Sequence, residues 1–373
     1  ECRYRLGLTR FVLKQYEKSA EDLSAYLAAD SKGPHADEAQ LYLARTHLEQ
    51  GELETAGEQL VSLIAGEGKV AARSALWYAR VYTRAEPADY DRASAILGTA
   101  TKAHSEAPII NDLRFDYANS LMARTEPSWE EALASLTLLR AEEDFGQQGE
   151  VLSQISVCQQ KLGKNEESLA SNNKFLAEHS EHRLVAEARF MKAENLFLLG
   201  RRDEASKSYA AFLDAHAEHP NFLAATFRQA QIHHAEGRWA ECIETSAAIV
   251  AADPKESLYD QLPFMIGDSL FRQEKWEQAV EPLSKFLSKR VTTSDEETSV
   301  KTGANVDTAL IQLAVCHDRG GRKEAALAQL DIVINNYPDT TSQLPLALAE
   351  QGRLAYEIDD LALARKALEQ FRE

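Results

Sequence analysis

The sequence is poor in the patterns that mark catalytic, metal-binding and membrane-spanning proteins. Its 373 residues include only 4 cysteines, which are far apart and form no CxxC pair, so their spacing predicts neither a metal knuckle nor a redox motif. No apolar run approaches the ~18 residues that a membrane-spanning helix requires. The strings GxSxG, HExxH, GxxxxGKS/T and GxGxxG are all missing. We therefore predict a non-catalytic protein with no cofactor and no metal site.

Basic charge is also scarce. The chain carries 41 Lys and Arg against 59 Asp and Glu, which gives a formal net charge of −18. Proteins that bind nucleic acid draw their affinity from clustered Lys and Arg, so this balance argues against a nucleic-acid partner. The carboxylates are mostly interspersed with Lys and Arg, as expected of a solvated surface. A hydrophobic content of 44% is typical of a folded protein.

What the sequence does contain is an internal repeat. A small residue recurs with successive steps of 37, 37, 39, 36, 37, 37, 37, 47 and 38 residues. We call it the anchor residue of each unit, and it is found at Ser19, Ala56, Ala93, Ala132, Ser168, Ala205, Cys242, Ala279, Ala326 and Ala364. Ten units at one period indicate a repeat array in place of two or three globular domains.

Each unit has the same internal pattern. A second small residue precedes the anchor by 12 residues, or by 14 where the turn is longer, as Gly7 precedes Ser19. Large apolar residues follow the anchor at four and seven positions, which places them on one helical face, as with Tyr209 and Phe212. Aromatic residues often stand three positions before the anchor, at Tyr16, Tyr90, Trp129, Trp239 and Trp276.

This pattern predicts two helices per unit, joined by a short turn and packed closely where both residues are small. One such hairpin cannot bury its own apolar face, so neighbouring units must stack on it. Sustained period-two alternation is lacking, so strands are not expected. We predict an all-α solenoid of about ten helical hairpins that occupies residues 1–373 as a single domain.

The repeat resembles the tetratricopeptide repeat. That family has a small residue at its eighth position, Ala at its twentieth, a large apolar residue at its twenty-fourth and Pro at its end, which Pro254 and Pro338 match here. The period of about 37 departs from the family's 34 and implies longer links or helices. The resemblance implies a right-handed α-α superhelix that acts as a protein–protein interaction scaffold and binds a peptide or partner helix in its concave groove.

The links between units resemble those of bacterial cell-envelope repeat proteins. Residues 31–39, 178–183 and 215–220 are similar to links in outer-membrane-assembly lipoproteins and Tol–Pal-associated coordinators. This likeness implies the bacterial periplasm or cell envelope, with the cytoplasm as the alternative. The chain starts and stops within expected helices, which predicts a segment of a longer or processed protein. A docking or sensor segment of a larger enzyme, or a module that binds cell-wall polysaccharide, remain alternatives.

The resemblance also points to groove positions. The family's fifth position is occupied here by Phe190, Phe227 and Phe264, its twelfth by Phe197, His234 and Phe271, and its ninth, in early units, by Arg45 and Arg80. These eight residues are our candidate binding residues, with packing between repeats as the alternative for the aromatic ones. No unit combines Lys at the fifth position with Asn at the ninth, so the family's clamp for chaperone tails is not expected.

Two further features are the long step in the repeat and a pair of histidines that recurs in adjacent links. The step of 47 places about ten extra residues within 288–305, a polar stretch that we expect to form an exposed loop or a helix extension. His179 and His182 precede His216 and His219 by 37 residues, so the two pairs occupy equivalent links. Such imidazoles can bind a transition metal or respond to pH, but the exposed links favour no metal.

Overall fold

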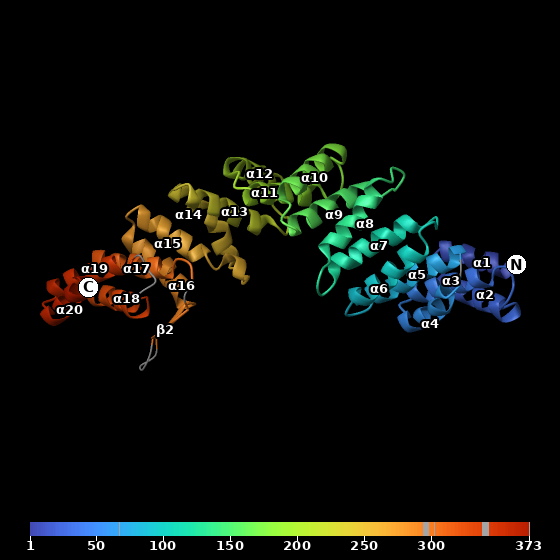
Figure 1. The fold of residues 1–373 in the computed structure, drawn as a ribbon, viewed down its shortest axis with the longest axis horizontal. Coiled ribbons are helices and arrows are strands. Elements are labelled where there is room, and N and C mark those ends of the chain that lie inside the picture. Colours follow the sequence, from blue (N-terminus) through green and yellow to red (C-terminus); the bar gives the residue numbers. More distant parts are fainter. Residues whose placement is uncertain (67, 294–297, 302, 338–342, 373) are drawn as a thin grey trace. The chain divides into compact units, whose positions relative to one another are not determined.

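A computed structural model of the chain describes residues 1–66, 68–293, 298–301, 303–337 and 343–372. Within these residues the structure is almost entirely helical, with 20 α-helices (Figure 1). They divide into two compact units, residues 1–201 and residues 202–373. We call them unit 1 and unit 2, and from here on the ten repeated hairpins are called repeats.

The helices of unit 1 follow one another through short links. They are α1 (Cys2–Val12), α2 (Tyr16–Ala29), α3 (Ala36–Glu49), α4 (Leu53–Ile64), α5 (Gly68–Thr83), α6 (Tyr90–Ala103), α7 (Ile110–Ala123), α8 (Trp129–Arg140), α9 (Gln148–Lys161), α10 (Asn165–Glu178) and α11 (Val185–Leu198).

Unit 2 continues the same order and adds three short elements. Its elements are α12 (Arg202–Ala215), α13 (Phe222–Ala235), α14 (Trp239–Ala252), the 3-10 turn η1 (Ser257–Tyr259), α15 (Leu262–Arg272), α16 (Trp276–Ser288), β1 (Val291–Thr293), β2 (Thr298–Val300), α17 (Val306–Arg319), α18 (Lys323–Asn336), α19 (Leu344–Glu357) and α20 (Leu361–Arg372).

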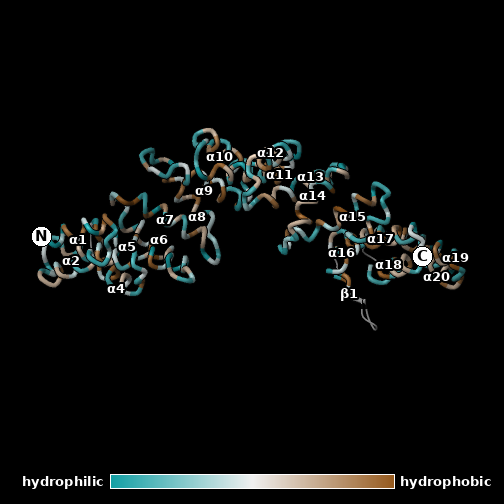
Figure 2. The backbone as a smooth tube through the Cα atoms, turned by 180° about the vertical axis from the view of Figure 1, so that it is seen from behind, coloured by the Kyte–Doolittle hydropathy of each residue, from teal (hydrophilic) through white to brown (hydrophobic). Residues whose placement is uncertain are grey.

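These helices match, in order, the first and second helices of the ten expected repeats. In both unit 1 and unit 2, the first helix of a repeat packs on the second helix of that repeat, as α3 does on α4 and α15 on α16. The second helix then packs on the first helix of the next repeat. The predicted fold class, an all-α solenoid of tetratricopeptide-like hairpins, is confirmed. Hydrophobic and hydrophilic residues alternate along the helices, as an amphipathic face requires (Figure 2).

The two small residues of each hairpin let its helices approach closely. The Ser19 hydroxyl donates to the backbone carbonyl of Gly7 at 2.8 Å, and Ser168 donates to that of Ser156 at 2.7 Å. At Gly267, a Cβ atom would lie 2.7 Å from Leu283 Cγ. The alanines in these two positions have no exposed surface at Ala44, Ala56, Ala79, Ala93, Ala118, Ala132, Ala193, Ala205, Ala230 and Ala279. Larger side chains would therefore separate the helices.

The large residues after the anchor form the core beside this contact. Tyr209, Phe212, Leu283 and Phe286 are all 0% exposed. The last helix differs, because its equivalent residues are half exposed, at 50% for Leu368 and 49% for Phe371. The rule that four and seven positions after the anchor are buried therefore holds in these inner hairpins but not in α20.

In eight of the ten hairpins the inner turn has one residue in the left-handed backbone region, five positions before the anchor, whereas the longer turns before Ala93 and Ala132 have none. Glycine fills this position with φ between 72° and 83° at Gly51, Gly163, Gly200, Gly237 and Gly321. Three repeats instead place Lys14, Glu274 and Asp359 there, with φ of 58°, 59° and 66°. A side chain in this region costs ~1–2 kcal/mol, so these turns are strained.

The long step of the repeat contains a strand pair where we expected a loop or a helix extension. β1 and β2 pair antiparallel, with Val291 opposite Val300. Both valines pack against the core around α16 and α17, and the Lys301 amide donates to the Arg290 carbonyl at 2.7 Å. Packing of the β-branched residues Val291 and Val300 thus stabilises part of this polar insertion as a β-hairpin. Residues 294–297 and 302 of the predicted insertion, and Pro338, lie outside the described residues.

In the part of the chain that the structure describes, no helix is both long and apolar enough to span a membrane.

The strained turn gives the first prediction. We expect Glu274→Gly to raise the free energy of unfolding by about 0.5–1 kcal/mol, because relief of left-handed strain outweighs the extra flexibility of glycine. Gly237→Ala at the same turn position should lower it by about 1 kcal/mol. Chemical denaturation of the two variants beside the parent chain measures both changes. Equal shifts in the same direction would contradict the assignment of strain.

Candidate functional site

The first helices of neighbouring repeats lie side by side within each unit. α1 contacts α3, α3 contacts α5 and α5 contacts α7 in unit 1, while α13 contacts α15 and α15 contacts α17 in unit 2. Among the described residues no comparably close contact joins successive second helices. The first helices therefore line the inner side of each unit, where stacked hairpins present their binding surfaces. We call this the first-helix face.

On the first-helix face of unit 1, Arg45 of α3 lies among three aromatic rings. Its guanidinium carbon is 4.7 Å from the ring centre of Phe11, 4.8 Å from that of Tyr42 and 4.2 Å from that of Trp77. The rings come from α1, α3 and α5, so three successive first helices build one cluster. Burial lowers the pKa of Arg45, and the nearby Arg73 and Arg80 add to this, although Tyr42 opposes it.

Arg80 extends this cluster toward α7. Its guanidinium carbon lies 4.6 Å from the ring centre of Trp77, and its Nε donates to Asp116 Oδ2 at 2.6 Å. Trp77 therefore contacts both Arg45 and Arg80, two of our candidate residues, which the structure brings together. Beside them a hollow of about 360 Å³ opens between α5, α6 and α7, lined in part by Arg80 and Asn119. Cation–π contact with Trp is the strongest of its class.

In unit 2 the first-helix face is built around a buried carboxylate. Asp268 of α15 has a side chain only 5% exposed and accepts from His234 Nε2 at 2.9 Å, from Gln312 Nε2 at 2.5 Å and from Arg272 Nε at 3.2 Å. Burial alone would raise the pKa of Asp268, but these donors outweigh it and hold the pKa below its ordinary value. The cluster joins α13, α15 and α17.

The candidate aromatic residues divide by burial. Phe227 and Phe264 are 1% and 5% exposed, and Phe264 packs on Phe286 with ring centres 5.3 Å apart, so burial favours the packing alternative for these two. Phe271 is half-buried and meets Trp276 edge to face at 5.0 Å. His234 contacts Phe264 at 6.2 Å between ring centres.

Phe190 and Phe197 lie in unit 1, on α11, and both are half-buried. Phe227, Phe264, Phe271 and His234 belong to unit 2, while Arg45 and Arg80 belong to unit 1. The structure thus brings Arg45 and Arg80 together through Trp77 in unit 1 and places His234 beside Phe264 and Asp268 in unit 2. That all eight bind a partner remains a prediction.

The histidine pairs of the links pack on their own helices. His179 and His182 contact the ring of Phe175 at 5.5 Å each, and His216 and His219 contact Phe212 at 5.3 Å and 5.4 Å. The second histidine of each pair accepts from a backbone amide through Nδ1, at 3.2 Å in His182 and 3.1 Å in His219. These histidines therefore order the links, and no group of three or more metal-ligating side chains is found among the described residues.

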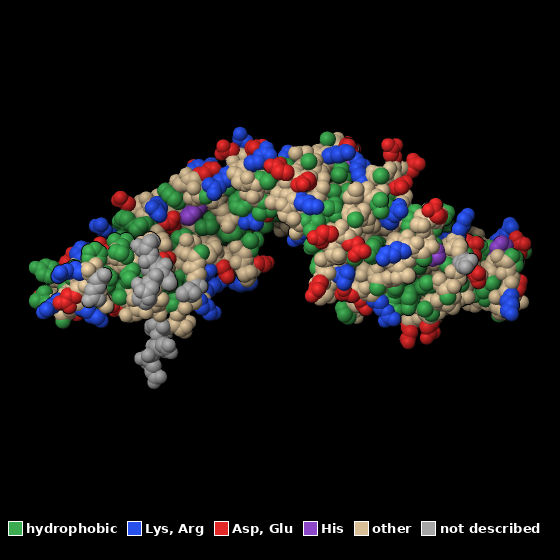
Figure 3. Space-filling view, in the orientation of Figure 1, with side chains coloured by type: hydrophobic (Ala, Val, Ile, Leu, Met, Phe, Trp, Pro, Cys, Tyr) green, Lys and Arg blue, Asp and Glu red, His purple; other side chains and the backbone are tan. Residues whose placement is uncertain are grey.

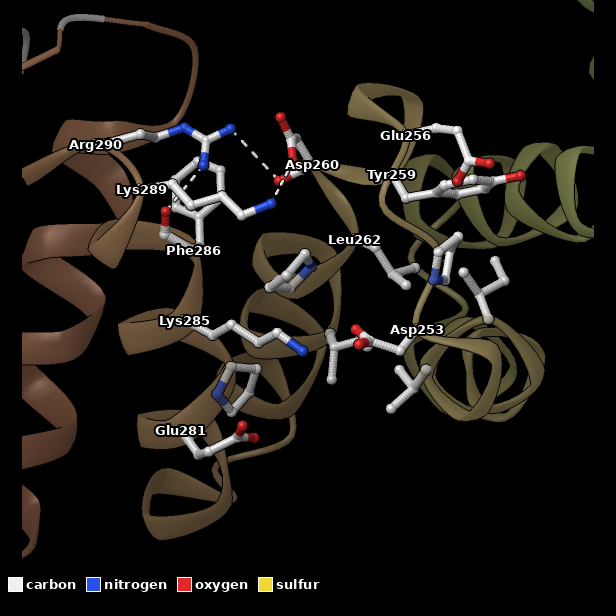
Figure 4. A pocket seen from close by; sticks show the side chains of 16 residues that line it. Asp253, Glu256, Tyr259, Asp260, Leu262, Glu281, Lys285, Phe286, Lys289 and Arg290 are labelled. Carbon is white, nitrogen blue, oxygen red and sulfur yellow. Dashed lines mark hydrogen bonds and ion pairs between the residues drawn. The ribbon is translucent and has the colours of Figure 1, made fainter.

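A separate pocket of about 200 Å³ lies away from the first-helix face, between the end of α14, the link 253–261, α15 and α16 (Figure 4). Its lining includes the apolar residues Ile249, Leu262 and Phe286. The Lys285 side chain points toward Asp253 (Figure 4). The link is longer than those at 179–184 and 216–221, and Ile249 stands where other repeats have Phe175 or Phe212. A smaller core residue and a longer link together leave this space.

The charged surface and the thiols of the described residues have ordinary environments. Acidic and basic side chains are interspersed on the visible faces of both units (Figure 3). Cys158, Cys242 and Cys316 are buried, as expected of small core thiols, while Cys2 is exposed. Burial raises the pKa of Cys158 and of Cys316 to about 11, which keeps both protonated and unreactive near neutral pH.

Sequence reasoning missed several members of these clusters. Tyr42 and Trp77 complete the Arg45 site, and Asp268 with Gln312 completes the His234 site, yet none was among the candidates. The available signal was position: Tyr42 and Trp77 each directly follow the fifth-position residues Leu41 and Leu76. A search for aromatic residues beside that position in consecutive repeats would have found the two rings.

Parts of the sequence match models of a known protein family. Residues 4–72, 190–257 and 308–340 match family models described as tetratricopeptide repeat. No curated protein matches the sequence. Both descriptions name a structural repeat, and neither names an enzyme.

Solved structures of low sequence identity also align. A tetratricopeptide repeat protein from Parabacteroides merdae is 14% identical, with 81% of this chain and 99% of that chain covered and a TM-score of 0.45. The C-terminal part of a repeat-containing protein from Cytophaga hutchinsonii is 13% identical, with coverages of 70% and 92% and a TM-score of 0.48. MamA from Desulfovibrio magneticus is 17% identical, with coverages of 53% and 99% and a TM-score of 0.40.

The buried carboxylate of unit 2 gives the second prediction. We expect Asp268→Asn to lower the free energy of unfolding at pH 7 by about 1–3 kcal/mol, because His234 and Arg272 lose a charged acceptor. The lowered pKa of Asp268 means that its contribution is complete above the ordinary Asp pKa of about 3.9 and is lost as the pH falls through the folded-state value. The difference between variant and parent should therefore shrink below pH ~4.

Chemical denaturation across this pH range tests the prediction. Glu244→Gln is the control, because Glu244 of α14 is an exposed carboxylate of the same unit. A constant difference between Asp268→Asn and the parent chain at all pH values would contradict the role of the ionised carboxylate.

Proposed function

Because the chain contains tetratricopeptide repeats, we propose that it is a non-catalytic scaffold that binds an extended segment of another protein along its first-helix face. Solenoid repeats bind their partners on such extended inner surfaces. The partner we propose is a peptide or a partner helix, held mainly by aromatic and arginine side chains. Residues of these types dominate the energetics of protein interfaces.

The observation that carries this proposal is the arginine and aromatic cluster of unit 1. Phe11, Tyr42 and Trp77 come from three successive first helices and meet at Arg45. All four side chains are only half-buried, so the cluster keeps accessible surface. Rigid rings fixed by packing bind a partner at low entropic cost. The hollow beside Arg80 continues this surface toward α7.

We further propose that the scaffold serves in a bacterial cell-envelope assembly. Support for this part comes from the link sequences at 31–39, 178–183 and 215–220. The structure gives these links a local role, since the histidines of two of them pack on Phe175 and Phe212. Locating the protein in fractionated cells of its source would test this part, and recovery outside the envelope would overturn it.

The third prediction tests binding on the first-helix face. We expect the purified chain to capture members of a pool of random short peptides, identified by mass spectrometry, and Trp77→Ala to weaken the dissociation constants of the captured peptides by about tenfold or more. Trp77 supplies the ring that contacts both Arg45 and Arg80, so its replacement removes the largest aromatic ring of the cluster. Fluorescence anisotropy with labelled copies of the captured peptides measures the constants.

Leu138→Ala is the matched control, because Leu138 is a 54% exposed residue on the second helix α8 of the same unit. It should leave the dissociation constants within about twofold of the parent. Circular dichroism confirms that both variants fold. If no peptide is captured, or if Leu138→Ala weakens binding and Trp77→Ala does not, binding on the first-helix face is refuted.

A further inference from the structure

The pocket between α14 and α16 lies on the opposite side of α15 from the first-helix face. Leu262 and Ile266 of α15 line this pocket, whereas Asp268 is the buried carboxylate of the first-helix face. With about 3.6 residues per turn, Asp268 stands roughly half a turn around the helix from Ile266. A segment bound in the pocket therefore leaves the first-helix face free. We call this site the α14–α16 pocket.

The α14–α16 pocket has the size and lining of a site for one apolar side chain. Its volume is about 200 Å³, and its lining includes Ile249, Ile266 and Phe286. A benzene ring fits an apolar cavity of ~150 Å³, so the side chain of a leucine or a phenylalanine fits here. Val250, which also lines the pocket, is 51% exposed, so apolar surface extends beyond the enclosed space. An occupant that covers both is larger than the cavity, as a protein segment is.

Contacts within unit 2 hold the walls of the pocket in place. Lys289 of α16 pairs with Asp260 of the link at 2.7 Å, and the Tyr259 ring meets Phe227 edge to face at 5.4 Å. Three of the chain's ten prolines also line the pocket, namely Pro254, Pro263 and Pro282. Each proline fixes its own backbone φ. A site whose walls are already ordered binds a partner at lower entropic cost.

The two charged walls of the pocket have opposite sign. The link 253–261 contains three acidic residues and one basic residue. The facing wall, residues 281–290, contributes three basic residues and one acidic residue to the lining. Figure 4 shows Glu256 of the link on one side of the pocket and Lys285 of α16 on the other. An occupant with charges of both signs therefore complements the two walls.

Some of these charges are already paired and others are not. On the link, Asp253 and Asp260 form ion pairs with lysines. Among the residues that the structure describes, Glu256 and Lys285 form no ion pair, and neither does Glu281, one turn before Lys285 on α16. Glu256 and Lys285 are thus free to pair with an occupant, each on its own wall.

We propose that the α14–α16 pocket is a second docking site, which takes one bulky apolar side chain of a partner-protein segment that carries a positive charge toward the link and a negative charge toward α16. The apolar side chain supplies most of the binding, because its burial removes hydrocarbon from water. The flanking charges contribute less, since ion pairs at an exposed rim are weak, but they select and orient the segment. The scaffold then holds two partner segments at once, one on the first-helix face and one in this pocket.

The test presents matched pools of random short peptides to the full chain. Two pools have Leu or Ala at the centre, flanked by one Lys and one Glu in either order. Three further pools have Leu at the centre, with flanks that are both Lys, both Glu or both Gln. Mass spectrometry quantifies the captured peptides, and a photoreactive leucine analogue at their centre locates the contact by crosslinking.

We expect the parent chain to enrich central Leu about tenfold over central Ala, because only the larger side chain fills the pocket. One Lys and one Glu flank should be enriched about threefold over two Gln flanks. The crosslinks should map to residues 249–266 and 281–290. Ile249→Phe should abolish these crosslinks, since it fills the pocket with the ring that Phe175 and Phe212 supply at the same position of other repeats.

Reversing the wall charges tests the proposed orientation. Glu256→Lys should shift the preference toward two Glu flanks, and Lys285→Glu should shift it toward two Lys flanks. The double variant should regain the preference for one Lys and one Glu, because it exchanges the signs of the two walls. Lys207→Glu is the control, since Lys207 is an exposed lysine of α12 in the same unit, and it should change no preference.

Trp77→Ala separates this site from the first-helix face, because it should leave the pocket crosslinks unchanged. The inference is wrong if the parent chain's crosslinks map elsewhere, if they survive Ile249→Phe or if Trp77→Ala removes them. If the pocket crosslinks form but Trp77→Ala weakens no peptide, the inference stands and the function proposed for the first-helix face fails. Circular dichroism checks the fold of each variant. Should Ile249→Phe prove unfolded, the loss and recovery of the flank preference in the single and double charge variants decide the matter.

Discussion

The close approach of the two helices in each hairpin is the constraint on which the other features of this protein depend. It requires a small residue on both sides of the contact, as the Ser19 hydroxyl at the Gly7 carbonyl shows, and a Cβ at Gly267 would collide with Leu283. Once the backbones touch, the large residues four and seven positions after the anchor can reach the core beside them. The turn before the anchor must then reverse the chain within a few residues, which explains the left-handed residue found in eight of the ten turns.

Much of this architecture is predictable from the sequence, because it depends on residue size at fixed spacing. The ten anchors, the glycine turns and the burial of Tyr209 and Phe212 all follow from positions within one hairpin. The strand pair at Val291 and Val300 was not predicted, since pairing there depends on packing against α16 and α17. The same limit applies to Phe227 and Phe264, where helix position alone does not distinguish a groove residue from a buried one.

The candidate sites were harder to predict because their contacts join residues one repeat apart. Arg80 and Asp116 are separated by 36 residues, Arg84 and Glu49 by 35, and His234 and Asp268 by 34. Whether two such residues meet depends on how far neighbouring helices are rotated and shifted, which a period of about 37 does not specify. Single members such as Arg45, Arg80 and His234 were therefore identified, while Tyr42, Trp77, Asp268 and Gln312 were not.

The tryptophans of this chain have a practical consequence. Each of the four has a cationic group close to its ring, since Trp77 contacts Arg45 and Arg80 while Trp129, Trp239 and Trp276 lie 6.0 Å, 5.9 Å and 6.0 Å from Lys161, Arg272 and Arg319. All three of the latter cations come from the next first helix, so each indole sits at a junction between repeats. The protein thus carries native fluorophores in both units, whose emission reports the opening of those junctions without any added label.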